Sequence, residues 1–323
     1  YYYESNWENI TGEVFSLSLL GGVKMSKMDM LFIYNPRAGK AQIRNHLVDI
    51  LDVFVKGGYE VTVYPTQARG DAIKKTKRKK DKYDIVVCSG GDGTLDEVFT
   101  GMMQCKKKVP IGYIPAGSTN DFAVSLNLSK NMVQAAEDVV NGDSFSVDVG
   151  MFNDDVFAYI AAFGLFTEVT YETDQQIKNV LGHVAYLLEG MKRLATIKTY
   201  KLKVTAGDKI IEDEFIFGMI TNSYSVGGFQ RITGNNVELD DGEFEVTLIK
   251  KPQNPIELNR VMASLVDRDI DAECMYCFKA SEVYIESQEE VSWTLDGEFG
   301  GSHKEVTVKN LHKSLEIRVP HRV

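Results

Sequence analysis

The stretch Ile85-Val86-Val87-Cys88-Ser89-Gly90-Gly91-Asp92-Gly93-Thr94 joins an apolar run to three glycines and then to a helical pattern. The apolar run is typical of a strand that is buried on both faces. Glycines placed directly after such a strand let the backbone approach a bulky anion. The N–H groups at the start of the following helix favour negative charge. The stretch therefore predicts a phosphate-binding turn.

Asp92 is the unusual member of this turn, because a carboxylate beside a phosphate is repulsive unless a cation lies between them. Thr94 adds a hydroxyl donor. A G-x-x-x-x-G-K-[ST] loop is absent, and a G-x-G-x-x-G fingerprint would need glycine where Asp96 stands. A tight turn that serves packing alone is the alternative. The residues favour a polyphosphate together with Mg²⁺.

Around this turn, strands and amphipathic helices alternate from residue 28 to residue 148. The apolar spacing predicts strands at 31–34, 59–64, 85–88 and 109–114 and helices at 43–54, 71–80, 92–104 and 132–140. Gly57 and Gly58 are expected to end the first helix. This alternation predicts an α/β domain with a Rossmann-like, mostly parallel sheet, and ligands of such sheets bind at the carboxyl ends of the strands.

The pattern changes after Asp148. One helical stretch, 175–194, stands among strands expected at 157–162, 200–205, 214–221, 244–249, 282–286, 291–295, 306–309 and 315–319. We therefore expect a nucleotide-binding domain at 28–150 and a mainly antiparallel β-sandwich domain at 151–323, whose C-terminal end could return to the first domain. Residues 1–27 are expected to form an N-terminal extension.

Composition excludes several classes of protein. The 323 residues are 44% hydrophobic, which is typical of a globular chain. The net charge of −10 argues against nucleic-acid binding. No apolar run is long enough for a membrane-spanning helix, and four cysteines indicate a reducing, cytoplasmic setting. The basic run from Lys74 to Lys82 is either a solvated helix face or a patch for anionic lipid headgroups.

Two further turns follow strands of the same predicted sheet. One is Asn35-Pro36-Arg37-Ala38-Gly39-Lys40, and the other is 115–123, in which Ser118 or Thr119 is expected to cap a helix. Each alone is ordinary turn chemistry. Three such turns at one edge of a sheet favour a nucleotide crevice.

Four motifs in order resemble the diacylglycerol kinase catalytic-domain family, in particular its soluble bacterial lipid kinases. They are Asn35-Pro-x-x-Gly39, Gly90-Gly-Asp-Gly-Thr94, Gly117-Ser-Thr-Asn-Asp-Phe122 and Asp296-Gly-Glu298. Sphingosine and ceramide kinases are relatives, and the resemblance covers roughly residues 28–320. It implies ATP- and Mg²⁺-dependent phosphorylation of a lipid hydroxyl, with diacylglycerol as the default acceptor and the site between the domains.

The resemblance also implies roles for individual residues. Glu298 would be the catalytic base, and Asp296 would order the metal in the company of Asp92 and Asp148. Asp-Gly is also a common hairpin turn. The implied nucleotide contacts are Asn35, Pro36, Arg37, Ala38, Gly39, Thr66, Gly90, Gly91, Asp92, Gly93, Thr94, Leu95, Asp96 and Ser118.

The segment 238–244 is a polar turn before a strand, and the resemblance places a structural Mg²⁺ there. Its ligands would be the side chain of Asp241 and the carbonyls of Glu238 and Glu243. Hard oxygen ligands suit Mg²⁺. An extra acid, Asp240, leaves open which aspartate binds the ion.

Two other functions remain as alternatives. One is a soluble-metabolite kinase of the NAD kinase type, since Gly-Gly-Asp-Gly-Thr also occurs in NAD kinases and phosphofructokinases. The other is a catalytically inactive regulator that binds nucleotide or lipid. The favoured prediction is a cytoplasmic kinase that meets its lipid substrate at the membrane surface, binds no nucleic acid and has no transmembrane segment. An exposed sheet edge could pair two copies into a homodimer.

Overall fold

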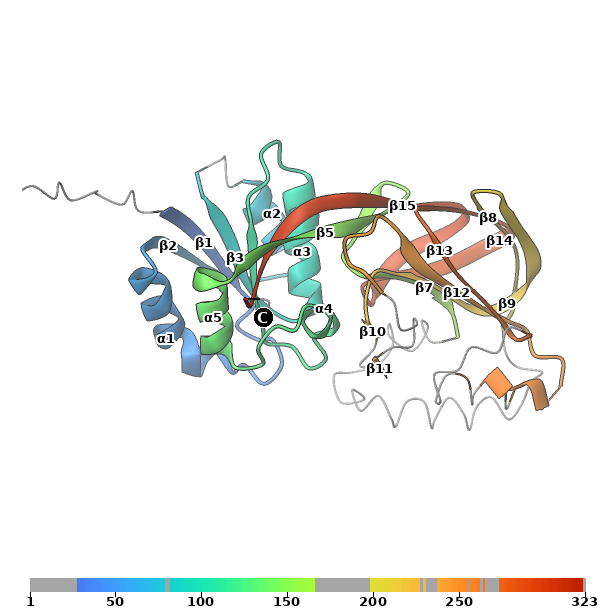
Figure 1. Cartoon of the computed structure of the whole chain (residues 1–323), viewed down its shortest axis with the longest axis horizontal. Coiled ribbons are helices and arrows are strands. Elements are labelled where there is room, and N and C mark those ends of the chain that lie inside the picture. Colours follow the sequence, from blue (N-terminus) through green and yellow to red (C-terminus); the bar gives the residue numbers. More distant parts are fainter. Residues whose placement is uncertain are drawn as a thin grey trace, which may run out of the picture.

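The computed structural model describes residues 28–78, 82–165, 198–226, 229–230, 237–254, 256–258, 260–261, 264 and 273–321. The predicted N-terminal extension and the predicted helix 175–194 lie outside the described residues. Two lobes lie side by side and are joined by long strands (Figure 1). Within the described ranges, no helix is long and apolar enough to cross a membrane.

Four strands of the first lobe pair in parallel in the order β2-β1-β3-β4. They are β1 (Met28–Tyr34), β2 (Tyr59–Pro65), β3 (Ile85–Gly90) and β4 (Ile111–Pro115). Along β1, Met30 and Phe32 pack into one core, and Leu31 packs into another on the opposite face. Side chains alternate across a strand, so an uninterrupted apolar run is what a strand covered on both faces requires.

Helices cover both faces of this sheet (Figure 1). α1 (Ile43–Lys56) packs against α5 (Met132–Asn141), and α2 (Asp71–Lys77) packs against α3 (Asp92–Met103). The predicted end of the first helix is confirmed, because α1 ends at Lys56 and the Gly57 N–H donates to the carbonyl of Val53.

The predicted N-cap of the helix that follows β4 was wrong. α4 (Asp121–Ser125) begins after Asn120, and neither Ser118 nor Thr119 is its N-cap. Asn120 has a φ of +55°. Its side-chain amide closes the turn on the N–H and the carbonyl of Gly117, at 2.9 and 3.0 Å. Asparagine tolerates the left-handed conformation, so it can serve here where serine or threonine would be strained.

The second lobe is built from antiparallel pairs, as predicted. Its strands are β6 (Asp155–Phe157), β7 (Ile160–Gly164), β8 (Tyr200–Ala206), β9 (Lys209–Thr221), β10 (Ser225–Val226), β11 (Phe229–Gln230), β12 (Phe244–Lys250), β13 (Met275–Ala280) and β14 (Glu282–Leu295). Because β7 and β8 each pair with both β9 and β14, the pairing closes around a core that contains Phe163, Phe215 and Trp293.

Some predicted strands have other boundaries. The stretches 282–286 and 291–295 form the single strand β14, whereas 157–162 is divided between β6 and β7. The division falls at Ala158 and Tyr159, whose N–H groups donate to the carboxylate of Asp296.

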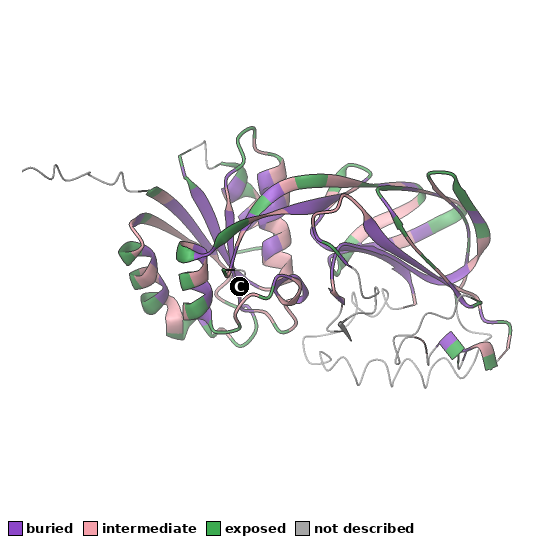
Figure 2. Cartoon of the chain, viewed as in Figure 1, coloured by how far each residue is buried: buried purple, intermediate pink, exposed green. Residues whose placement is uncertain are grey.

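Two long strands link the lobes (Figure 1). β15 (Glu298–Val319) pairs with β14 over its first half and with β5 (Asp143–Phe152) over its second. Its Ile317 pairs in parallel with Ile111 of β4, so the last strand of the chain completes the sheet of the first lobe. Buried residues fill the central strands of both lobes, and exposed residues lie on outer helical faces and hairpins (Figure 2).

Candidate active site

Three turns meet at the carboxyl ends of β1, β3 and β4. The Asn35 N–H donates to the carbonyl of Ser89 at 2.8 Å, and the Ala116 N–H donates to the carbonyl of Gly90 at 2.7 Å. A Cβ placed on Gly39 would lie 2.4 Å from the Ala116 oxygen. The three turns predicted to form a crevice are therefore packed against one another.

The glycines of the central turn have different tasks. A Cβ on Gly90 would overlap the Thr94 side chain, and one on Gly117 would lie 2.6 Å from the Cα of Gly91. These two positions are glycine because neighbouring atoms leave no room. Gly93, in contrast, faces open space. The first turn of α3 is therefore open at Gly93, whereas the N–H groups of Thr94 and Leu95 donate to the carbonyl of Gly91, at 2.9 and 3.3 Å.

The remaining predicted nucleotide contacts border this turn. Thr66 follows β2, and its N–H donates to the carbonyl of Tyr34 at 2.9 Å. Arg37 and Ser118 are exposed, whereas Ala38 is buried. The Leu95 side chain is fully buried in the core, so this residue can offer a ligand only its main chain.

Asp92 begins α3 at the centre of the site. Its carboxylate accepts a long hydrogen bond of 3.4 Å from the Phe122 N–H. Burial, the nearby Asp121 and, more weakly, Asp296 raise the pKa of Asp92 to about 6. The site thus disfavours the charged form of this carboxylate in the absence of a compensating cation.

Asp296 comes to the same place from the hairpin between β14 and β15. It is 5% exposed and has a φ of +50°. Its carboxylate accepts hydrogen bonds from the backbone N–H groups of Ala158, Tyr159 and Ile160. Burial raises the pKa of Asp296 although these three donors favour its charged form. The three bonds fix the direction of the hairpin that carries Glu298.

Asp96 of α3 faces Asp296 across the two lobes. Burial and then the charge of Asp296 raise the pKa of Asp96 well above its usual value, and the two carboxyls share a hydrogen bond. Such a bond needs one proton, so burial of the pair favours a state in which one of the two carboxyls is protonated. The side chain of Asp96 therefore serves the contact between the lobes.

Asp121 lies in the site, although from the sequence it was named only as part of the motif 117–122 and was given no role. Its side chain is buried, and Ser225 of the second lobe donates its hydroxyl to the carboxylate. The adjacent Ser125 and Ser223 hydroxyls are 2.8 Å apart across the same boundary. The sequence signal for Asp121 is its position in the motif 117–122, directly after Asn120, whose side chain closes the turn.

Glu298 lies at the margin of this group and is half exposed. Its carboxylate is 3.1 Å from the guanidinium of Arg69. The loop that carries Arg69 is held by Glu97 of α3, which accepts hydrogen bonds from the N–H groups of Gly70 and Ala72 at 2.7 and 2.9 Å. Neither Arg69 nor Glu97 was predicted as a site residue.

Asp148 does not join this group as the resemblance implied. Its buried carboxylate accepts hydrogen bonds from the Gly242 and Lys313 N–H groups, both at 2.7 Å, and lies 3.2 Å from the His312 ring. The carboxylates that contribute to the pKa of Asp92 are those of Asp121 and Asp296. Asp148 is directed instead to the turn 238–243, because the backbone donors that satisfy it belong to that turn and to β15.

The predicted structural metal turn also differs from the expectation. One Asp241 oxygen accepts from the Glu243 N–H at 2.9 Å, and the other lies 2.6 Å from the Lys279 ammonium. Lys279 further approaches Glu245 at 3.4 Å. The Lys279 ammonium thus compensates the charge of Asp241 at the position where a metal ion was expected to do so.

The carboxylates around Asp92 present the opposite case. In the part of the chain that the structure describes, no lysine or arginine forms an ion pair with Asp92 or Asp296. That described part of the chain also contains no group of three or more His, Cys, Asp or Glu side chains that could hold a metal ion. The carboxylates of Asp92 and Asp296 fit Mg²⁺, because this ion is usually held by one or two carboxylates and otherwise by water and substrate phosphates.

Comparison with known proteins agrees with this geometry. Residues 29–152 match the diacylglycerol kinase catalytic domain, and residues 160–317 match the YegS C-terminal NAD kinase beta sandwich-like domain. The chain is 33% identical over 291 residues to a diacylglycerol kinase of Bacillus subtilis (strain 168), covering 89% of this chain and 95% of the relative. It is also 33% identical to one of Staphylococcus carnosus, covering 89% and 94%.

Two crystal structures of Bacillus anthracis str. Sterne proteins share the fold. One has a TM-score of 0.79 at 25% identity and covers 92% of this chain and 97% of that chain. The other, described as a diacylglycerol kinase, has a TM-score of 0.72 at 24% identity and covers 90% and 97%. A two-domain kinase is thus the class that the fold and the family matches define. The chain belongs to the diacylglycerol kinase family and is a lipid kinase.

Proposed function

We propose that this kinase transfers the γ-phosphoryl group of ATP to the hydroxyl of a diacylglycerol, giving phosphatidic acid. The observation that carries the proposal is the meeting of buried carboxylates from both lobes at a glycine turn, with Asp92 and Asp121 on one side and Asp296 on the other. Nucleotide phosphates over that turn and a lipid hydroxyl near Glu298 would be adjacent.

The first domain, taken as residues 28–150, is proposed to be a Rossmann-like nucleotide-binding domain, and residues 151–323 form the acceptor domain. Support comes from the parallel order β2-β1-β3-β4 and from the open space at Gly93. The nucleotide contacts would be those implied by the resemblance, with Leu95 contributing its main chain only. Bound Mg²⁺, held by Asp92, would neutralise phosphate charge during transfer.

Glu298 is proposed to accept the proton of the lipid hydroxyl. A half-exposed carboxylate at the edge of the site can reach an acceptor that enters from outside. Asp296 acts through its three backbone hydrogen bonds by holding the hairpin in place. Since phosphoryl transfer needs mainly positioning and charge stabilisation, these groups suffice for in-line transfer. The enzyme would work from the cytoplasm as a peripheral membrane protein.

The decisive experiment is phosphorylation with labelled ATP and Mg²⁺ on diacylglycerol in mixed micelles, with ceramide, sphingosine and NAD as parallel acceptors. We expect label in phosphatidic acid from the wild type and about a 1,000-fold loss in Glu298→Gln. Glu290→Gln, an exposed site on β14, is the matched control and should retain activity. Label in NAD alone would favour the NAD kinase type, and ATP binding without any labelled product would indicate an inactive regulator.

A further inference from the structure

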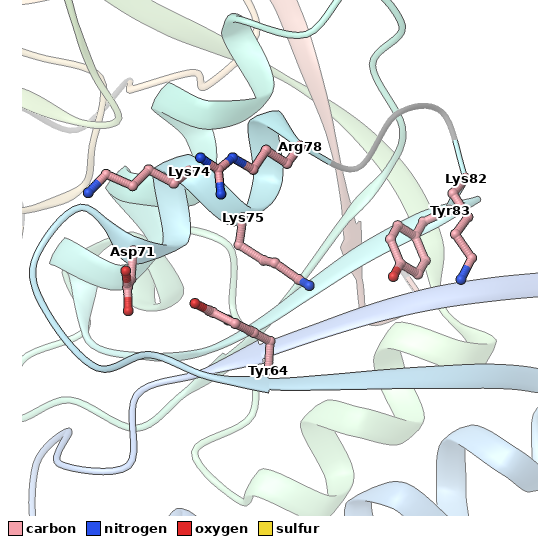
Figure 3. Close-up of a pocket in the computed structure, with 7 residues that line it drawn as sticks. All are labelled: Tyr64, Asp71, Lys74, Lys75, Arg78, Lys82 and Tyr83. Carbon is pink, nitrogen blue, oxygen red and sulfur yellow. The ribbon is translucent and has the colours of Figure 1, made fainter.

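A pocket of about 330 Å³ lies between α2, the end of β2 and the start of β3 (Figure 3). It is lined by Tyr64, Asp71, Lys74, Lys75, Arg78, Lys82 and Tyr83. None of these residues belongs to the candidate active site. The volume lies within the range of small-ligand sites.

The charge of this pocket is strongly positive. Lys74 and Lys75 lie in α2, Arg78 directly follows it, and Lys82 lies in the segment before β3 (Figure 3). Lys74 and Arg78 are four residues apart, and the Arg78 N–H donates to the carbonyl of Lys74 at 3.1 Å, so both lie on one side of the C-terminal end of α2. Among the described residues, no carboxylate forms an ion pair with any of the four. Cations gathered in this way repel one another unless an anion joins them.

Asp71 does not neutralise the pocket, although it lines it. Its carboxylate accepts hydrogen bonds from the N–H groups of Gln67 and Ala68, at 2.8 and 3.3 Å. These bonds close the turn before α2, and the single negative charge of Asp71 against four cations leaves the pocket positive. The two tyrosine rings hold cations in position, with the Lys75 ammonium 4.7 Å from the centre of the Tyr64 ring and the Lys82 ammonium 5.4 Å from that of Tyr83.

We propose that this pocket binds the phosphate of an anionic phospholipid headgroup and so attaches the first domain to the membrane. The inference rests on the proposed function to the extent that a lipid kinase must approach a bilayer to reach its acceptor. A phosphate offers oxygens to several cations at once, and tyrosine hydroxyls can bond to the same group.

The net charge of the chain favours one orientation of the protein at a membrane, with this pocket facing the anionic surface. With a net charge of −10, most of the molecule is repelled by an anionic surface. A local group of four cations is attracted to that surface, and the attraction acts within a Debye length. The membrane would therefore be approached with the α2 face forward.

The test is co-sedimentation with vesicles of phosphatidylcholine alone or with added phosphatidylglycerol. We expect binding only to the anionic vesicles, falling as salt is raised. The double variant Lys74→Gln/Arg78→Gln should lower the vesicle partition coefficient about 30-fold, because each basic residue near the surface contributes roughly fivefold. Both side chains are exposed, so their replacement leaves the core of the domain intact, which thermal unfolding of the variant checks.

A matched comparison separates a pocket from a diffuse basic surface. Lys77 lies on the same helix and is exposed, but it does not line the pocket. Arg78→Gln should weaken vesicle binding clearly more than Lys77→Gln. Equal effects of the two variants would overturn the pocket, as would binding by the double variant that matches the wild type.

Inorganic phosphate distinguishes the two sources of a phosphate group. At constant ionic strength, inorganic phosphate should compete with anionic vesicles for the pocket, and vesicle binding that excess phosphate leaves unchanged would overturn the proposal. Calorimetric binding of inorganic phosphate by a protein that ignores anionic vesicles would overturn the proposal and leave a site for a free ion. Activity of the wild type on a dispersed short-chain diacylglycerol is measured separately, so failure of the proposed function is distinguishable from failure of this inference.

Discussion

Two acidic turns of this molecule differ in how their charge is compensated. Around Asp92, carboxylates from both domains meet, and burial raises their pKa values. In the turn 238–243, Asp241 forms an ion pair with Lys279. The neighbouring Asp148 of β5 accepts hydrogen bonds from the backbone N–H groups of Gly242 and Lys313. The sequence motifs are alike, since both combine aspartate with glycine. The difference is that the charge around Asp92 is left uncompensated by the chain, as the proposed cation and phosphate site requires, whereas the charge of Asp241 is compensated within the fold.

The largest expected effect comes from Asp92→Asn, which should lower kcat/KM about 1,000-fold. In the folded protein the pKa of Asp92 is about 6, against an ordinary value of 3.8. The folded state then binds more protons between these values, so stability falls as pH rises from about 4 to 6 and stays lower above. The Asn variant should therefore be more stable than the wild type, by up to about 3 kcal/mol at pH 8.

Denaturant unfolding at pH 8 and at pH 4 measures this effect, and the gain should vanish at the lower pH. The matched variant is Asp241→Asn, which removes a carboxylate that has a cation partner and should be destabilising at pH 8. Destabilisation of similar size by both variants would contradict the distinction between the two turns.

The glycine turn gives a second comparison within one loop. Gly93→Ala meets open space and lies in a helix, so we expect a folded protein of equal or slightly higher stability. Its nucleotide affinity should fall about 100-fold, because a methyl group then lies where the ligand approaches. Gly90→Ala, which overlaps Thr94, should instead lower stability by about 1–3 kcal/mol. Calorimetric ATP binding and thermal unfolding separate the two outcomes, and unchanged ATP affinity in Gly93→Ala would exclude this turn as the nucleotide site.

Arg69→Gln tests whether the ion pair with Glu298 positions that carboxylate. We expect kcat to fall about tenfold with KM for ATP unchanged. Because the pair is exposed, the loss of stability should stay below about 1 kcal/mol. Arg69→Lys, which keeps the positive charge, should restore part of the lost kcat, and a kcat equal to that of the wild type in Arg69→Gln would contradict the role.

The smallest effect is expected at Lys279. Lys279→Met should lower stability by about 1 kcal/mol and leave turnover unchanged, because this part of the second domain is structural. Addition of a metal chelator should not alter the unfolding of the wild type. Unfolding that becomes markedly easier with chelator would show that a metal ion, and not Lys279, is the partner of Asp241.

Much of this architecture follows from local patterns of sequence. The end of α1 at Gly57 and the glycine turn before α3 were predictable because periodicity and turn chemistry act within a few residues. The bond between Ser225 and Asp121 was not, since it joins residues 104 positions apart. The direction of Asp148 and the partner of Asp241 depend equally on distant residues. Motifs name candidate carboxylates, but the donors that surround each of them come from the tertiary fold.

The path of β15 has a consequence for biosynthesis. Ile317 completes the parallel sheet that begins with β1, yet it is translated after the whole second domain. The amino-terminal half cannot finish its own sheet while the ribosome is still extending the chain, so the two halves should acquire their final stability together. Truncation before residue 315 is expected to leave an aggregation-prone, unpaired edge at β4.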